Sequence, residues 1–176
     1  LLCERYSRHL EKLQELAHKE LRRLEKDPER LQIAKFYAAR IMELSELWEN
    51  RLQRDILSEF AALERRGKLS LLTCIGTHPF LPAYQAEPES IRLQIRLTIE
   101  AFKRAFGRAP KGVWLPECGF FDGLDEYLAE QGLQYFFMET HGVLLADPAP
   151  KYGVFAPIKT PSGLLVLGRE QASSVE

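Results

Sequence analysis

The sequence is poor in cysteine, almost neutral in charge and free of long apolar runs. Its three cysteines, Cys3, Cys74 and Cys118, form no CxxC pair and no disulfide framework, which is typical of a reducing compartment. The formal net charge of −1 gives no reason to expect a nucleic-acid partner. No apolar run approaches the roughly 20 residues of a membrane span. We therefore expect a cytoplasmic protein that neither crosses a membrane nor binds nucleic acid.

The composition is that of a globular protein with a core. Apolar residues make up 45% and charged residues 28% of the 176 positions, which are ordinary values for a globular domain. The chain starts at Leu1, inside a helical pattern, and stops at Glu176, just after a strand-like run. From these two ends we expect an internal fragment of a longer protein.

Residues 1–66 predict two helices. Apolar side chains recur every three to four residues in each, and the second stripe continues over 31–63. Asp27 and the proline after it predict the start of the second helix, since aspartate caps N-termini and proline suits the first helical position. Gly67 predicts its end. We expect an antiparallel helical hairpin that serves structural packing, with a docking surface for a partner helix as the alternative.

Residues 67–176 alternate between strand-like and helical patterns. Glu87 and Pro88 open one helix, which Gly107 closes, and Asp122 is a candidate cap of the next, which Gly132 closes. The predicted elements are strand 69–75, helix 87–106, strand 112–115, helix 122–131, strand 135–138, and a hairpin of 154–158 with 164–167. Such alternation predicts parallel βα units. Three alternating strands and a hairpin are too few to close a barrel, which needs about 250 residues.

Polar side chains follow each of the three predicted parallel strands. Thr77 and His78 follow the first, Glu117 and Cys118 follow the second, and residues 139–141 follow the third. In parallel barrels the carboxyl ends of the strands carry the active site, because their loops converge there. This coincidence is the strongest functional signal in the residues themselves.

Several chemistries could use these residues. A metal site is disfavoured, because no HxH, HxxxH or CxxC spacing is present. A nucleophilic pair of Cys118 and His141 has no local signature. A glutamate nucleophile acting on a sugar fits better, because Trp114, Phe120 and Phe121 surround Glu117 and aromatic faces suit the apolar faces of sugar rings.

The segment around Glu117 resembles a known enzyme family. Residues 112–120 read Gly-Val-Trp-Leu-Pro-Glu-Cys-Gly-Phe and are similar to the nucleophile motif of glycoside hydrolase family 57, usually Trp-Leu-Pro-Glu-Cys-Ala-Tyr. Gly119 and Phe120 depart from that form. Four further segments resemble the branching enzymes of this family: 77–82, 89–96, 106–112 and 136–142, although aspartate is common where Glu139 stands. Gly168 and Arg169 resemble the stretch before a conserved Val-Trp-Ser. The resemblance covers about residues 31–176.

The resemblance implies part of a distorted (β/α)7 barrel, with residues 1–66 as a helical hairpin inserted in or packed on it and 67–176 as its central βα units. It implies a retaining α-1,4-glucan branching enzyme with Glu117 as the nucleophile and no metal or organic cofactor. The expected substrate-binding residues are His78, Trp114, Cys118, Glu139 and His141.

Two parts of the family pattern are absent: an N-terminal His-Gln-Pro motif and the aspartate that acts as general acid. We therefore expect that this chain alone is inactive without the remainder of its catalytic domain. A hydrolytic α-amylase, a 4-α-glucanotransferase and a non-catalytic glucan-binding remnant stay open as alternatives.

Overall fold

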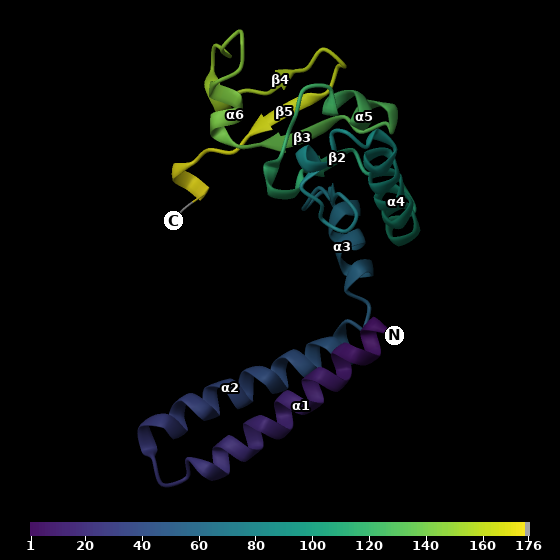
Figure 1. Cartoon of the computed structure of the whole chain (residues 1–176). Coiled ribbons are helices and arrows are strands. Elements are labelled where there is room, and N and C mark those ends of the chain that lie inside the picture. Colours follow the sequence, from purple (N-terminus) through teal and green to yellow (C-terminus); the bar gives the residue numbers. More distant parts are fainter. Residues whose placement is uncertain (175–176) are drawn as a thin grey trace. The chain divides into compact units, whose positions relative to one another are not determined.

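The computed structural model describes residues 1–174 (Figure 1). Packing divides the chain into two compact units, Leu1–Arg66 and Gly67–Glu176. Each unit has its own helices, and only the second contains strands. Over residues 1–174, none of the helices combines the length and the apolar character that a membrane span requires.

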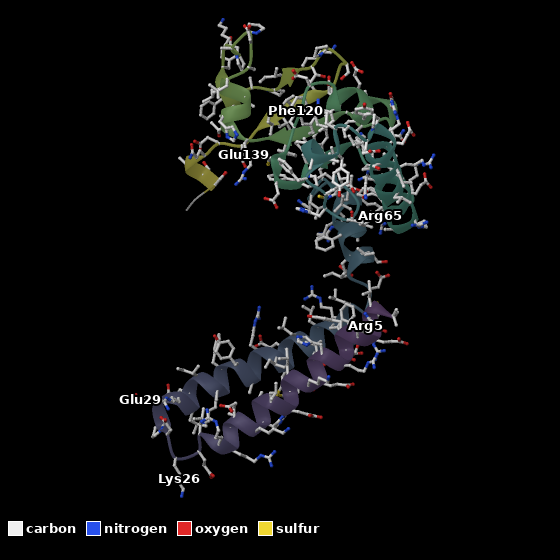
Figure 2. The ribbon with its side chains drawn as sticks, in the orientation of Figure 1. Arg5, Lys26, Glu29, Arg65, Phe120 and Glu139 are labelled. Carbon is white, nitrogen blue, oxygen red and sulfur yellow. The ribbon has the colours of Figure 1, made fainter. Side chains whose placement is uncertain are left out.

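The first unit is built on two long helices, α1 (Leu2–Arg23) and α2 (Pro28–Glu46), which pack side by side (Figure 1). The predicted cap is present, because the Asp27 carboxylate accepts a hydrogen bond from the Arg30 backbone N–H at 3.2 Å. At this turn the charged side chains of Lys26 and Glu29 point away from the helices (Figure 2). The hairpin and its turn therefore follow from local sequence signals.

The second predicted helix does not continue unbroken to residue 66. After a π-helical turn at Leu47–Arg51, Gln53 and Arg54 adopt left-handed backbone conformations with φ of 50° and 63°. A new helix, α3 (Ile56–Arg65), then starts with Asp55 as its cap, accepting from the Ser58 N–H at 3.0 Å. The apolar stripe runs through the break, so periodicity alone could not reveal it.

A polar network closes the open end of the hairpin. The Trp48 indole N–H donates to Ser7 Oγ at 3.0 Å, and that hydroxyl donates to Glu49 Oε1 at 2.6 Å. The ring of Tyr6 meets the Trp48 ring edge-on, with centroids 4.9 Å apart. Ser7 and Trp48 are buried together with Leu10. These contacts hold residues 41 positions or more apart in sequence.

The second unit contains a five-stranded sheet in the order β1-β2-β3-β5-β4. Its strands are β1 (Thr73–Cys74), β2 (Gly112–Trp114), β3 (Tyr135–Met138), β4 (Ile158–Lys159) and β5 (Leu165–Gly168). The predicted hairpin is confirmed, since β4 and β5 pair antiparallel. However, β5 also pairs parallel with β3, so the sheet has four parallel strands where the sequence predicted three.

The helices between the strands are α4 (Pro88–Phe106), α5 (Leu124–Glu130) and α6 (Thr140–Leu144). Gly107 ends α4 in the left-handed conformation, with φ of 70°, as predicted. The proposed Asp122 cap is wrong, because Gly123 precedes α5 and no side chain caps it. Short 3-10 turns occupy Leu81–Tyr84, Pro116–Cys118, Gly153–Phe155 and Ala172–Ser174.

One continuous core joins the sheet to its helices. Apolar residues of α4, α5 and the strands are almost fully buried, including Ile91, Ile95, Val113, Leu124 and Phe136. Each buried side chain of this size stabilises the fold by about 1.5–3 kcal/mol. The core thereby fixes the positions at which the four parallel strands end.

Candidate active site

The loops after the four parallel strands leave the sheet at one edge. Because β1, β2, β3 and β5 run in the same direction, their carboxyl ends lie together there (Figure 1). The predicted site residues at positions 78, 117–118 and 139–141 all follow these ends. Arg169, which directly follows β5, joins them.

Glu117 projects from a turn with unusual backbone geometry. Glu117 and Cys118 both have φ of 51°, in the left-handed region that favours glycine. The Cys118 N–H donates to the Leu115 carbonyl at 2.9 Å and the Gly119 N–H to the Pro116 carbonyl at 3.0 Å, so the turn is closed twice. Pro116 and Cys118 are buried, whereas Glu117 is exposed. Such conformations cost about 1–3 kcal/mol each and cluster at functional sites.

The loop after β1 repeats this geometry. Thr77 and His78 have φ of 56° and 55°. The His78 N–H donates to the Ile75 carbonyl at 3.1 Å, and the Thr77 hydroxyl donates to Gln94 Oε1 at 3.2 Å. The His78 side chain is exposed, and within residues 1–174 it makes no hydrogen bond to Glu117. Two neighbouring strand ends therefore present a polar side chain from the same kind of turn.

A cluster of five side chains lies at the ends of β2, β3 and β5. Glu139 forms an ion pair with Arg169, whose guanidinium carbon lies 5.7 Å from the centre of the Trp114 ring. The Trp114 ring stacks on Phe137, with centroids 5.1 Å apart. The Cys118 thiol interacts with both Glu139 and Arg169. Three of the predicted site residues, Trp114, Cys118 and Glu139, are thus brought together.

The thiols at this edge are poor nucleophiles. Burial, followed by the hydrogen bond and negative charge of Glu139, raises the pKa of Cys118, and Arg169 offsets this only in part. Burial likewise raises the pKa of Cys74. Since the thiolate is the reactive form, both cysteines stay protonated near neutral pH. The alternative of a nucleophilic Cys118 paired with His141 is therefore disfavoured.

A cavity of about 410 Å³ opens beside this cluster. It contains Glu139 and His141 of the predicted site, but Glu117, His78, Trp114 and Cys118 do not line it. Figure 2 marks Glu139 where the chain leaves β3. The lining residues are Glu139, Thr140, His141, Leu144, Arg169, Gln171 and Ser174. Hydroxyl, amide, carboxylate and guanidinium groups line it, which suits a ligand rich in hydroxyl groups.

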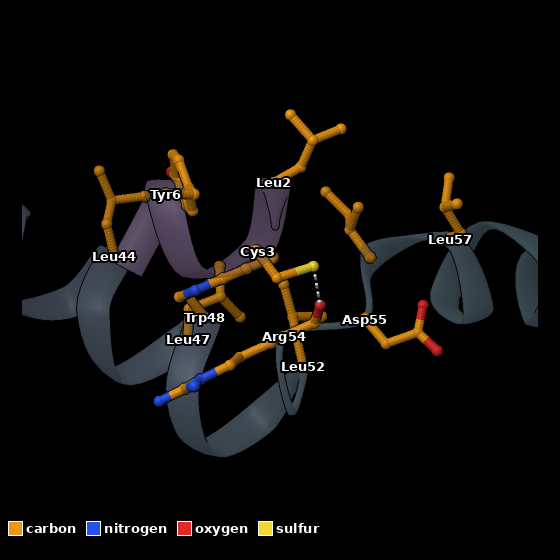
Figure 3. A pocket seen from close by; sticks show the side chains of 11 residues that line it. Leu2, Cys3, Tyr6, Leu44, Leu47, Trp48, Leu52, Arg54, Asp55 and Leu57 are labelled. Atoms are coloured by element: carbon orange, nitrogen blue, oxygen red, sulfur yellow. Dashed lines mark hydrogen bonds between the residues drawn. The ribbon is translucent and has the colours of Figure 1, made fainter. Parts of the chain in front are cut away.

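A second cavity, of about 490 Å³, lies in the helical unit and has a different character (Figure 3). Apart from Cys3, Arg54 and Asp55, its lining side chains are apolar or aromatic. The Cys3 thiol is directed at the Arg54 carbonyl oxygen, 3.5 Å away (Figure 3). Its lining is therefore mainly apolar, in contrast to the polar lining of the cavity beside Glu139.

No group of three or more His, Cys, Asp or Glu side chains within residues 1–174 is arranged to hold a metal ion. The polar side chains at the sheet edge are spread over four loops. Their arrangement offers carboxylates, a guanidinium and imidazoles for hydrogen bonding and acid–base work.

Comparison with known proteins decides the family. The family model described as "Glycosyl hydrolase family 57" matches residues 3–174. The chain belongs to this family. The prediction from the Glu117 segment is confirmed at the level of the family, and the open parallel sheet is part of the (β/α)7 barrel of family-57 enzymes.

Solved structures of the family share the fold over nearly the whole chain. The crystal structure of the "novel alpha-amylase AmyC from Thermotoga maritima" superposes with a TM-score of 0.90 at 40% identity over 99% of this chain. The branching enzyme of Pyrococcus horikoshii superposes with a TM-score of 0.86 at 24% identity over 97% of the chain. The matched region spans 34% of each of these structures, about a third of their length.

A curated relative is the 1,4-alpha-glucan branching enzyme TK1436 of Thermococcus kodakarensis. It is 31% identical over an alignment 119 residues long, which covers 59% of this chain and 17% of that enzyme. The family-57 members that resemble this chain therefore include an α-amylase and branching enzymes.

Sequence reasoning gave Arg169 no role in the site. The preceding segment, 164–167, is predicted only as one arm of a hairpin, so its end is not among the predicted parallel strand ends. The pairing of β5 with β3 is what brings Arg169 to the same edge as Glu139.

Proposed function

We propose that this chain carries the nucleophile of a retaining 1,4-α-glucan branching enzyme, and that the nucleophile is Glu117. One observation supports the choice over Glu139. Glu139 is engaged by Arg169, whereas Glu117 is exposed and, within residues 1–174, has no ion-pair partner. A carboxylate that must form a bond to carbon needs an unengaged oxygen, and Glu117 has one.

The chemistry proceeds in two displacements. A Glu117 oxygen attacks the anomeric carbon, the glycosidic C–O bond breaks, and a general acid outside this chain protonates the leaving oxygen. A sugar 6-hydroxyl then attacks the same carbon and gives its proton to the general acid, which now acts as a base. The bond between the sugar and Glu117 breaks, and an α-1,6 branch with retained configuration is formed. Retention requires the two carboxyl groups to lie about 5–5.5 Å apart.

The other predicted residues bind the glucan. His78 donates a hydrogen bond to the sugar beside the scissile bond. Trp114 and Cys118 shape the floor of the sugar-binding pocket. Glu139 and His141 contact sugar hydroxyls from the 410 Å³ cavity. We propose that residues 1–66 pack on or insert into the barrel. The reaction uses no metal or organic cofactor and serves glycogen-type polymer synthesis in the cytoplasm.

Hydrolysis is the second candidate, because the α-amylase of Thermotoga maritima matches at 40% identity over 99% of the chain. The two reactions share the glycosyl-enzyme step and differ only in whether a sugar hydroxyl or water attacks it. A 4-α-glucanotransferase would pass the glycosyl group to a 4-hydroxyl, and a non-catalytic remnant would bind glucan without turnover.

Product analysis separates these candidates. The full-length protein is incubated with amylose, and α-1,6 linkages and reducing ends are counted by proton NMR and a reducing-sugar assay. Branching predicts new α-1,6 linkages without new reducing ends. New reducing ends without branches would support the amylase. Glu117→Gln should abolish turnover, and Glu126→Gln, which changes an exposed carboxylate on α5, serves as the matched control.

A further inference from the structure

The backbone of Arg169 is hydrogen-bonded to both sequence neighbours of Glu139. Its N–H donates to the Met138 carbonyl at 2.8 Å, and its carbonyl accepts a hydrogen bond from the Thr140 hydroxyl. These two bonds flank Glu139 on both sides in sequence. The ends of β3 and β5 are therefore joined around the carboxylate, and the Arg169 side chain starts from a fixed point.

The Arg169 side chain contacts Glu139 after β3, Trp114 in β2 and Cys118 in the turn after β2. It forms the ion pair with Glu139 and lies over the Trp114 ring, and it interacts with the Cys118 thiol. The side chains of Arg169 and Glu139 are 33% and 32% exposed, so the pair is partly withdrawn from water. Partial burial makes the attraction stronger than in a surface ion pair. A planar guanidinium can bind a carboxylate and stack on an aromatic face at the same time, whereas the ammonium of lysine combines these two contacts poorly.

Both members of this ion pair line the 410 Å³ cavity. Without Arg169, the Glu139 carboxylate would lose its ion pair, and the Trp114 ring would lose the guanidinium contact. Arg169 is therefore the residue that contacts both Glu139 in the cavity wall and Trp114 beside it.

We propose that Arg169 is a positioning residue of this site, which orients Glu139 and Trp114 for the glucan through the ion pair and the ring contact. The inference rests on the proposed function and deepens it. Arg169 acts through Glu139, whose negative charge stabilises the positive charge that develops on the sugar in the transition state. Its loss therefore lowers kcat more than it raises KM.

A double-mutant cycle in the full-length enzyme tests the proposal. We measure kcat and KM on amylose for wild type, Arg169→Met, Arg169→Lys, Glu139→Gln and the Arg169→Met/Glu139→Gln double variant. Arg169→Met should lower kcat/KM by about tenfold or more, within the range of coupling between contacting residues. The double variant should lose no more than Glu139→Gln alone. Arg169→Lys should recover part of the loss, since it keeps the charge and not the planar contact.

Arg92→Met is the matched control. Arg92 also combines an ion pair, to Glu130 at 3.0 Å, with an aromatic contact, 4.7 Å from the Tyr127 ring centre, but it lies on α4 and is not among the residues that line the 410 Å³ cavity. It should leave kcat and KM unchanged while shifting the melting temperature about as much as Arg169→Met does.

Three results would overturn the proposal. The first is an active enzyme whose kinetics Arg169→Met does not change, and the second is losses that multiply in the double variant. Either result rejects only the positioning role of Arg169 and leaves the proposed role of Glu117 unaffected. The third is a folded wild-type protein that neither binds nor converts amylose, which rejects both the proposed function and the inference built on it.

Discussion

The ring of Phe80 lies against the α-carbon of Gly119, where the loops after β1 and β2 touch. A β-carbon at position 119 would lie 2.6 Å from Phe80 Cε2 and 2.9 Å from Pro82 Cδ, far inside normal contact. The usual family motif has alanine at this position. The glycine therefore permits an approach of the His78 loop to the Glu117 turn that a side chain would block.

Gly119→Ala should displace Phe80 and separate these loops. Phe80 is 51% exposed and can swing into solvent, but Pro82 cannot, so we expect a modest stability loss of about 1–3 kcal/mol. The kinetic effect on amylose should exceed that of Phe80→Ala alone. The Phe80→Ala/Gly119→Ala double variant removes the ring clash, and a melting temperature no better than that of Gly119→Ala would contradict this account.

The roles of Glu117 and Glu139 can be separated by covalent trapping. A fluorinated glycosyl donor should label the full-length enzyme on the peptide that contains Glu117. Glu117→Gln should abolish turnover, whereas Glu139→Gln should cost a few kcal/mol of transition-state stabilisation, at about tenfold in rate per 1.4 kcal/mol. A label on Glu139, or near-normal turnover in Glu117→Gln, would reverse the assignment.

His78 should matter for activity and little for stability. Its side chain is exposed and makes no hydrogen bond within residues 1–174, so His78→Ala removes no side-chain hydrogen bond of the folded state. We expect a strong fall in kcat/KM of the full-length enzyme with a nearly unchanged melting temperature. If the melting temperature falls in proportion to activity, His78 is a structural residue.

Asp125 should make stability depend on pH. Burial alone would raise its pKa, but hydrogen bonds from Ser162 and Thr160 outweigh burial and lower the pKa. The folded state therefore favours the carboxylate. The contribution of this carboxylate to stability is fully present above the aspartate pKa of the unfolded chain, about 3.9. It is lost as the pH falls through the lower pKa that Asp125 has in the folded protein.

The measurement is the free energy of unfolding between pH 7 and pH 2. Asp125→Asn should cost about 1.5–3 kcal/mol at pH 7, and the difference from wild type should shrink in acid. Asp122→Asn, which changes an exposed neighbouring carboxylate, is the control. A difference that stays constant with pH would show that the carboxylate form contributes nothing.

The isolated chain should not turn over amylose. Four parallel strands do not close a (β/α)7 barrel, and the proposed general acid lies outside residues 1–176. We expect no loss of iodine colour and no new α-1,6 linkages with the purified chain. Robust turnover, together with a sharp two-state melting transition, would show that these residues suffice.

Much of this fold could be predicted from local patterns. The strand Tyr135–Met138, the helix that ends at Gly107 and the start at Asp27 appear where the sequence indicated. Each depends on neighbours within a few residues: alternation, a capping carboxylate or a glycine that tolerates positive φ. The family could also be recognised from sequence, because the Glu117 segment is short and contiguous.

The tertiary structure alone decided the rest. Arg169 reaches Glu139 only because β5 pairs parallel with β3, and strand pairing depends on partners distant in sequence. The left-handed conformations at Thr77, Glu117 and Gln53 occur at residues with no intrinsic preference for positive φ. Local propensity cannot predict such conformations, because packing elsewhere in the fold must compensate for their cost.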